Sequence, residues 1–599
     1  MGTDESEILS FLDKYATVFN TMAQDILKRA NNEGAQSYPN PFNQERLQKL
    51  LSGETKIDAN KLVQNQFDYM QKQTELWQLA TKQMLGESVS DEQSKAHSKD
   101  KAKHKGDRRF SHQQWDENPI YNYIKQSYLI NAEMVTNLVD AIEFSDAKSK
   151  EQAKFFTRQY VNSLSPTNFV LTNPDVCEEM LATKGQSLIK GMQAYLEDLE
   201  QSPLEAFKMR QTDAKAFTLG KNLAYTPGKV IYRNELIELI HYAPTTKTQH
   251  EVPVLITPPF INKYYVMDLE EKKSLAKGLL DSGYNVFMIS WVNADSEQRD
   301  NNFVDYMRKG PLAAIEVVKE ITQKDQVNLT GFCVGGTLSA VTAAYLRGMG
   351  DNSIASLTLL TTLLDFTEPG EVGNYFSEDM LPMIEQNAEI KGVFDGRIIA
   401  MSFSLLRENS LFWSFFIDNY LKGKDPAPFD ILYWNSDSTN IPAACFKQYL
   451  RMTYWDNAFK DPGKVSIDGI PIDFGNIDVP TYFLTTVADH IVLWKGAYEG
   501  TKLVSGDTRF VLAGSGHIAG VINPTNGGKY PHWTNDELPE SPEQWLEGAK
   551  EQKGSWWQDW HAWLKPNAGK RKTARLPGKD ESYPGICDAP GTYVLKRLE

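Results

Sequence analysis

The residue best placed for nucleophilic chemistry in this sequence is a cysteine flanked by glycines. It lies in the stretch Thr330 to Ser339, TGFCVGGTLS, between an apolar run from Val327 and an Ala-rich segment through Leu346. A strand, a sharp turn and a helix, with small residues around the nucleophile, are typical of a nucleophile elbow. Small neighbours are needed there because the turn is strained and a Cβ would clash. We predict that Cys333 is the nucleophile; the other interpretation is a buried structural cysteine beside glycines that serve packing.

A cysteine nucleophile needs a base, because a free thiol is mostly protonated at neutral pH. Among the histidines that follow the elbow, His517 lies in a Gly-rich turn after an apolar run, as the order nucleophile, acid, histidine of α/β-hydrolases requires. Asp489, at the end of the apolar run from Tyr482, is the matching acid. His490 is the rival base, but its apolar neighbours favour the start of a helix. The sequence therefore predicts a Cys333–Asp489–His517 triad at the carboxyl edge of a sheet.

The predicted elbow also requires an oxyanion hole. In this fold one amide comes from the residue after the nucleophile, and another comes from the loop after an early strand. The first amide would be that of Val334. The second would lie in the loop 258–263, PPFINK, whose two prolines have no amide hydrogen. We expect Ile261 to be the donor in this loop.

The elements that must position these residues change character near residue 215. Helical periodicity dominates before it, and short buried apolar runs alternate with helical patterns after it. This alternation predicts a mostly parallel sheet with right-handed crossovers, entered through a hairpin. The expected strands are 229–234, 236–242, 252–257, 285–290, 327–330, 353–361, 479–485 and 508–512.

The expected fold is therefore α/β, with an α/β-hydrolase core preceded by a mostly helical domain. We predict a helical N-terminal domain at 1–214, with a mobile Lys-rich loop at 86–109, and a catalytic domain at 215–599. The aromatic-rich excursion at 366–478 is too long for a simple connection and predicts an inserted lid. The tail at 566–599 is rich in Lys, Gly and Pro, and we expect it to be irregular.

Two apolar stripes mark helices near the N-terminus. Residues from Ile8 to Ile26, and from Val63 to Trp77, place apolar side chains three and four positions apart. We expect these helices to pack against each other in an ordinary pair. The alternative is that an amphipathic face docks on a partner or on a hydrophobic particle.

The composition limits the class of protein. The chain of 599 residues has a net charge of −15, which argues against a primary role in nucleic-acid binding. No apolar run is long enough to cross a bilayer, and the N-terminus lacks the pattern of a secretory signal. The four cysteines lie far apart, without metal-ligand spacing. We expect a cytoplasmic, reduced protein without disulfides or a transmembrane segment.

Several motifs together resemble those of class I polyhydroxyalkanoate synthases. They span roughly residues 110–565 in the expected order and are GFCVGG at 331–336, PPFINKYY at 258–265, SFSLLR at 402–407, WNSDSTN at 434–440 and GHIAG at 516–520. The resemblance implies an α/β-hydrolase core with a lid behind a helical domain. It makes Cys333 the nucleophile that holds the growing chain as a thioester, His517 the general base and Asp489 the third member.

The resemblance also implies a substrate and partners. The enzyme would polymerise 3-hydroxyacyl-CoA into polyester with release of CoA, and it would need no cofactor. It would be a homodimer in the cytoplasm, attached to the growing polyester granule, with granule-associated proteins contacting the N-terminal domain. Trp434 matches a family tryptophan near the active site and dimer contact, and Arg407 matches a position associated with CoA binding. We group Asn262 with them as a substrate contact.

Two other functions fit parts of the pattern. A cysteine α/β-hydrolase, acting as a thioesterase or polyester depolymerase, would share the fold and the triad but resolve the intermediate with water. A non-catalytic granule scaffold would fit the fold, and the intact triad argues against it. Within the synthase interpretation Asp489 either activates the substrate hydroxyl or only orients His517.

Overall fold

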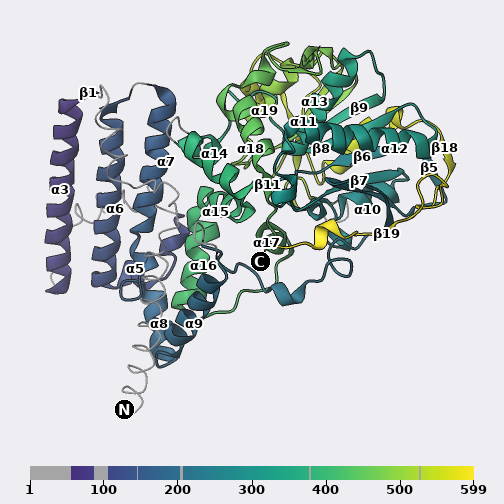
Figure 1. Ribbon diagram of the computed structural model, residues 1–599. Coiled ribbons are helices and arrows are strands. Elements are labelled where there is room, and N and C mark those ends of the chain that lie inside the picture. The colour runs from purple at the N-terminus through teal and green to yellow at the C-terminus, as the bar shows by residue number, and fades with distance from the viewer. Residues whose placement is uncertain are drawn as a thin grey trace. The chain divides into compact units, whose positions relative to one another are not determined.

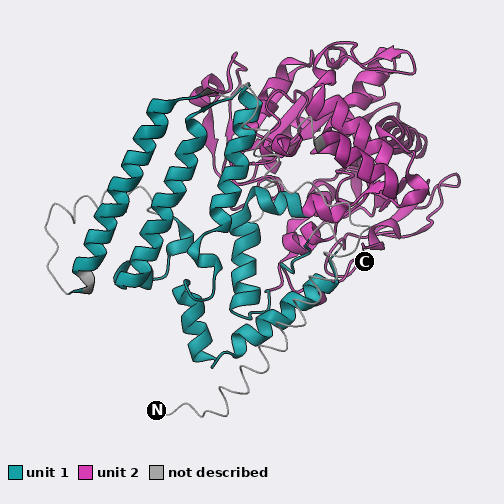
Figure 2. Cartoon of the chain, turned by 60° about the vertical axis from the view of Figure 1, so that its left-hand side comes forward, with its two compact units in different colours: residues 1–211, 401–426 teal, residues 212–400, 427–599 magenta. Residues whose placement is uncertain are grey.

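A computed structural model describes residues 56–85, 106–144, 146–202, 207–376, 380–524 and 528–598 (Figure 1). The predicted helix at 8–26 and most of the Lys-rich loop lie outside these residues. Contacts divide the chain into two compact units, Met1–Gln211 with Met401–Pro426, and Thr212–Ala400 with Ala427–Glu599 (Figure 2). Within the described ranges, no helix is long and apolar enough to span a membrane.

The first unit is built from helices. In its described residues a short strand pair, β1 (Lys56–Ile57) with β2 (Ile142–Glu143), accompanies α3 (Ala59–Met84), α5 (Gln114–Glu117), α6 (Pro119–Asp140), α7 (Ala147–Ser163), α8 (Pro174–Ala182) and α9 (Gln186–Glu200). Two Asn-Pro pairs begin helices α6 and α8. The side chains of Asn118 and Asn173 accept amide hydrogen bonds of the first turn, and the proline that follows each lacks the amide that would remain unpaired.

The apolar stripe of α3 is exposed. The side chains of Phe67 and Trp77 are 63% and 60% exposed, whereas Asn65 and Leu76 on the opposite side are buried. The buried side packs on α6, where Asn65 Nδ2 donates to Met134 O at 3.0 Å. The partner expected for this stripe, the helix at 8–26, lies outside the described residues, so the packed helical pair stays a prediction. Among the described residues, the face of α3 that packs on α6 is the one opposite the apolar stripe.

The segment 401–426 belongs to the helical unit, although its aromatic-rich sequence predicts a lid of the catalytic domain. It contains the end of α15 (Gly396–Leu406), the π-helical turns η9 (Glu408–Trp413) and η10 (Ile417–Leu421), and α16 (Ser414–Phe416). Buried hydrogen bonds tie it to the N-terminal helices: Tyr420 OH donates to Asp198 Oδ2 at 2.5 Å, and Asn162 Nδ2 donates to Glu408 Oε1 at 2.6 Å.

The second unit is organised around a mixed sheet of 11 strands. Six parallel strands form its centre, antiparallel strands extend both edges, and the predicted α/β fold is confirmed. In spatial order the strands are β17 (Lys550–Gln552), β16 (His532–Thr534), β15 (Thr508–Ala513), β14 (Thr481–Thr486), β9 (Ile354–Leu360), β8 (Val327–Phe332), β6 (Val254–Thr257), β7 (Val286–Trp291), β4 (Ile237–Tyr242), β3 (Gly228–Arg233) and β19 (Cys587–Asp588).

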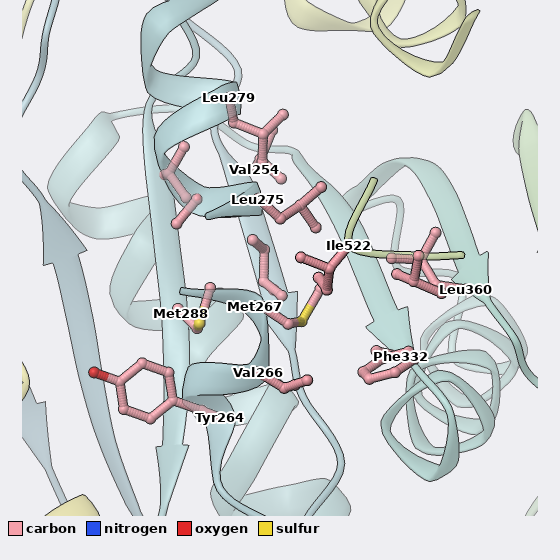
Figure 3. Packing of buried hydrophobic residues seen from close by; sticks show 14 of the residues in the cluster. Val254, Tyr264, Val266, Met267, Leu275, Leu279, Met288, Phe332, Leu360 and Ile522 are labelled. Carbon is pink, nitrogen blue, oxygen red and sulfur yellow. The ribbon is translucent and has the colours of Figure 1, made fainter. Parts of the chain in front are cut away.

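Helices and aromatic side chains close the core around this sheet. The α-helices of the unit, besides the first part of α15, are α10 (Leu275–Asp281), α11 (Phe303–Met307), α12 (Ala313–Thr322), α13 (Val334–Gly348), α14 (Met380–Lys391), α17 (Asp430–Ser436), α18 (Ala443–Leu450), α19 (Trp494–Glu499), α20 (Pro542–Gly548) and α21 (Trp557–Leu564). Figure 3 shows part of the core, where Leu275 of α10, Val254 of β6 and Ile522 lie among buried neighbours. The tryptophans of the Trp-dense segment, Trp556, Trp557 and Trp560, are also buried in this cluster, so they serve packing.

The C-terminal tail is more regular than its composition indicates. Strand β18 (Arg571–Thr573) pairs with β5 (Thr248–His250), and β19 adds an edge strand beside β3. A composition rich in Lys, Gly and Pro identified an exposed segment, but it did not reveal that free strand edges of the catalytic unit would pair with it.

Candidate active site

The elbow is formed where β8 ends and α13 begins. Cys333 connects them with φ 53° and ψ −126°, a backbone conformation that residues other than glycine rarely adopt. A Cβ on Gly335 would lie 2.3 Å from Thr257 O, so the chain can turn this closely only with glycine. The turn leaves the Cys333 side chain partly exposed at the carboxyl edge of the sheet.

Asp489 and His517 follow the neighbouring parallel strands β14 and β15, whose ends meet at that same edge. The two side chains are joined by a hydrogen bond of 2.7 Å between His517 Nδ1 and Asp489 Oδ2. His517 also lies close enough to Cys333 for the charge of the sulfur to raise the pKa of the imidazole. The structure therefore brings the three predicted triad residues together, with His517 rather than His490 at the centre.

The carboxylate of Asp489 is fixed by several donors. Its Oδ1 accepts the amides of Ile491 and Val492, each at 2.9 Å, while Oδ2 accepts from His517 and, at 3.4 Å, from the hydroxyl of Thr486. The side chain is 0% exposed. Because both oxygens are occupied, the carboxylate is positioned to hold the imidazole and to stabilise its positive charge.

The imidazole of His517 is buried and carries an unusual affinity for a proton. Burial by itself lowers the pKa of His517, but the charges of Asp489 and Cys333 outweigh it and raise the pKa to about 10. The ring also stacks on Phe332, with centroids 5.4 Å apart. The arrangement favours an imidazolium beside the sulfur, which is the environment that activates a cysteine nucleophile.

The two predicted oxyanion donors lie on adjacent elements. Val334 is the first residue of α13, so its amide has no acceptor within the helix, and the helix N-terminus favours negative charge there. Ile261 lies half-buried in the turn after β6, which pairs with β8 beside the elbow. The contact between Gly335 and the Thr257 carbonyl brings this loop against the elbow.

The three predicted substrate contacts have different surroundings. Trp434 is buried, and its Nε1 donates to Lys263 O at 2.6 Å, so it supports the loop after β6. Asn262 forms a single antiparallel bridge with Ser438. Arg407 is exposed and belongs to the helical unit, so its role in CoA binding stays a prediction.

Two tyrosines beside the nucleophile were not predicted. Tyr449 of α18 and Tyr454 in the π-helical turn η11 (Arg451–Trp455) have ring centroids 6.1 Å apart, and both lie close enough to Cys333 to interact with its charge. Burial, the charge of the other tyrosine and that of Cys333 raise the pKa of Tyr449, and burial and Cys333 raise that of Tyr454. Both phenols therefore remain neutral. Their only signal in the sequence was the aromatic content of the predicted lid.

The fold and this arrangement define an α/β-hydrolase-type protein with cysteine at the nucleophile position. Residues 253–524 match the family model for the alpha/beta hydrolase fold, and residues 106–279 match the model for the poly-beta-hydroxybutyrate polymerase (PhaC) N-terminus. The chain is 43% identical over 495 residues to the poly(3-hydroxyalkanoate) polymerase subunit PhaC of Cupriavidus necator, covering 82% of this chain and 83% of that protein. It is 42% identical over 489 residues to the poly(3-hydroxyalkanoate) polymerase of Methylorubrum extorquens, covering 82% and 80%.

The chain belongs to the poly(3-hydroxyalkanoate) polymerase family. The resemblance to polyhydroxyalkanoate synthases is thereby confirmed.

Proposed function

We propose that this protein polymerises 3-hydroxyacyl-CoA thioesters into a polyhydroxyalkanoate polyester and releases CoA. The observation that carries the proposal is the hydrogen bond between Asp489 and His517 beside Cys333, which lies at a nucleophile elbow. Because the chain belongs to the poly(3-hydroxyalkanoate) polymerase family, we infer that these three residues serve polyester synthesis. The scheme requires no metal or organic cofactor, because CoA arrives with the substrate.

In the acylation step, the Cys333 sulfur attacks the thioester carbonyl after its proton passes to His517. The amides of Val334 and Ile261 stabilise the tetrahedral oxyanion, a contribution of a few kcal/mol for each donor. Collapse of this intermediate breaks the bond to the CoA sulfur, and His517 returns the proton to that sulfur. The products are free CoA and a hydroxyacyl thioester on Cys333.

In the elongation step, the 3-hydroxyl of one unit attacks the thioester carbonyl of another and forms the ester bond of the polymer. His517 accepts the hydroxyl proton and delivers it to the departing sulfur, so the same base serves both steps. We assign the orienting role to Asp489, because its two oxygens are already engaged by His517 Nδ1 and by the amides of Ile491 and Val492.

A cysteine nucleophile suits this sequence of reactions. Transfer from CoA to Cys333 exchanges one thioester for another, so the acyl group stays activated for the next transfer. A serine would form a more stable oxygen ester, from which chain extension is harder. Cysteine therefore allows the enzyme to hold a growing chain without losing the driving force for its extension.

The exposed stripe of α3 supports a contact between the helical unit and the polyester granule. Phe67 and Trp77 lie on the same helix face as Val63 and Met70, which are 68% and 61% exposed. Removing such a face from water favours adsorption to an apolar surface. We propose a cytoplasmic homodimer at the granule surface, where granule-associated proteins contact the same unit.

Incubation with 3-hydroxybutyryl-CoA tests the proposal, with CoA release, turbidity and free acid measured in the same reaction. CoA release with insoluble polymer is the expected result. CoA release with free 3-hydroxybutyrate would instead identify a thioesterase. A protein that releases no CoA would have retained the fold as a scaffold, and the proposal would be rejected.

A further inference from the structure

The last described residues of the chain return to the loop that follows β6. Lys263, at the end of this loop, is 2% exposed, and its Nζ donates to Val594 O at 3.1 Å and to Lys596 O at 2.6 Å. A buried ammonium loses its hydration, so protein groups must replace the hydrogen bonds to water. Carbonyls of residues 592–598, which we call the C-terminal strap, do so here, while burial lowers the pKa of Lys263 to about 8.

The C-terminal strap is itself held by the catalytic unit. Glu238 of β4 is 0% exposed and accepts the amides of Thr592 and Tyr593 at 2.8 and 3.0 Å. Asn293 Nδ2 donates to Lys596 O at 3.0 Å, so this carbonyl receives hydrogen bonds from two elements. Because the strap is fixed independently of Lys263, it can in turn fix the position of Lys263.

Helix α17 joins the strap to the same loop from another direction. Arg597 Nη1 donates to Tyr433 OH at 2.6 Å, and Arg597 Nε lies 3.6 Å from the buried Asp437 Oδ1. Trp434 of the same helix donates to Lys263 O at 2.6 Å. Lys263 is therefore held at its side chain by the strap and at its backbone by α17.

We propose that the C-terminal strap fixes the oxyanion loop, residues 258–263, and that Lys263 is the positioning residue through which it acts. Ile261 lies two residues before Lys263, while the other end of the loop is held by a hydrogen bond of 2.9 Å from Trp291 Nε1 to Pro258 O. An amide displaced by about 1 Å from the developing oxyanion costs on the order of 10²-fold in rate. The inference rests on the proposed function, because only an acyl-transfer reaction uses this amide.

Two variants test the strap from its two sides. Lys263→Met removes the ammonium, and deletion of residues 594–599 removes its acceptors but leaves Lys263 in place. Each variant is expected to lower kcat for CoA release about 10–100-fold with KM changed less than about threefold. The double variant should lose no more kcat than either single variant. Lys263→Arg should restore most of the activity. Lys229→Met, which removes an exposed ion pair with Asp588 of the same tail, is the matched control and should behave as wild type.

Alkylation of Cys333 by iodoacetamide, followed by mass spectrometry, separates positioning from general damage. Displacement at an alkyl carbon forms no oxyanion, so the alkylation rate of both variants should stay within about twofold of wild type while CoA release falls. If only one variant folds, that variant decides the test. Wild-type CoA release, a parallel loss of alkylation, or failure of both variants to fold would overturn the proposal. Absence of CoA release by the wild-type protein would instead reject the proposed function.

Discussion

Asp489→Asn should slow CoA release by about 10²–10³-fold and leave the fold intact. The carboxylate lies 2.7 Å from His517 Nδ1, and together with Cys333 it raises the pKa of His517 from 6.5 to about 10. That shift corresponds to about 5 kcal/mol, and Coulomb's law with an effective dielectric constant of about 20 gives about 6 kcal/mol at this distance. Because Cys333 supplies part of the shift, we assign about 3–4 kcal/mol to Asp489.

The same substitution should change the pH dependence of Cys333 alkylation. Since the folded-state pKa of His517 is raised, the imidazolium persists through neutral pH and is lost only as the pH rises through about 10. With asparagine the carboxylate no longer offsets the lowering by burial, so the ring tends to be neutral at pH 7. Alkylation should therefore be slower in the variant than in the wild type at pH 7, and the difference should shrink as the pH rises through about 10, where the wild type loses its imidazolium.

Both readouts need a matched control. Asp478→Asn removes an acid of the same unit that is 63% exposed and paired with Arg347, and it should change neither rate more than about twofold. A variant Asp489→Asn that keeps more than about a tenth of wild-type CoA release, with an unchanged alkylation profile, would refute the electrostatic role assigned to this carboxylate.

The remaining predictions concern the nucleophile, the exposed stripe and a buried histidine. Cys333→Ala should abolish CoA release, and residual turnover above about 1% would remove Cys333 from the nucleophile role. Phe67→Glu combined with Trp77→Glu should reduce co-sedimentation with polyester particles about tenfold or more, whereas Gln78→Glu on the same helix should not. Burial lowers the pKa of His241 from 6.5 to about 4, so the unfolded chain takes up its proton first, and stability falls as the pH drops from 6.5 toward 4. The urea midpoint of unfolding should fall with the pH over this range, and it should fall less steeply in His241→Gln. An equally steep fall in the variant would contradict the role assigned to His241.

The sheet could be predicted because its strands are buried on both faces and read as continuous apolar runs. The run predicted at 479–485 corresponds to β14 (Thr481–Thr486), and the run at 508–512 to β15 (Thr508–Ala513). The membership of 401–426 in the helical unit could not be read in this way. It depends on bonds such as that between Tyr420 and Asp198, whose separation in the sequence is 222 residues. Helical periodicity likewise could not show which face of α3 is covered.

The positions of the triad residues followed from strand order, because parallel strands deliver their carboxyl ends to one edge. Asp489 and His517 each follow a predicted strand, so their meeting was implied by topology. Tyr449 and Tyr454, which interact with the charge of Cys333, lie on a helix and in a π-helical turn inside an insertion, and no periodic pattern fixes where such elements lie. The contact of Lys263 with the chain end joins residues 333 positions apart and has no local signature.

In the proposed function, the predicted triad alone does not decide whether the acyl chain is extended or hydrolysed, because His517 would deprotonate a water molecule as readily as a hydroxyl group. The difference must come from what surrounds the thioester. Tyr454 packs against the rings of Phe366 and Phe376, with centroids 5.1 Å apart in each pair, so aromatic carbon lies next to the phenols near Cys333. Such surroundings offer water few hydrogen bonds, whereas a hydroxyacyl chain can fill them with its own carbon atoms. We therefore expect the ratio of polymer to free acid to report on these aromatic side chains, and the rate of CoA release to report on Cys333, His517 and Asp489.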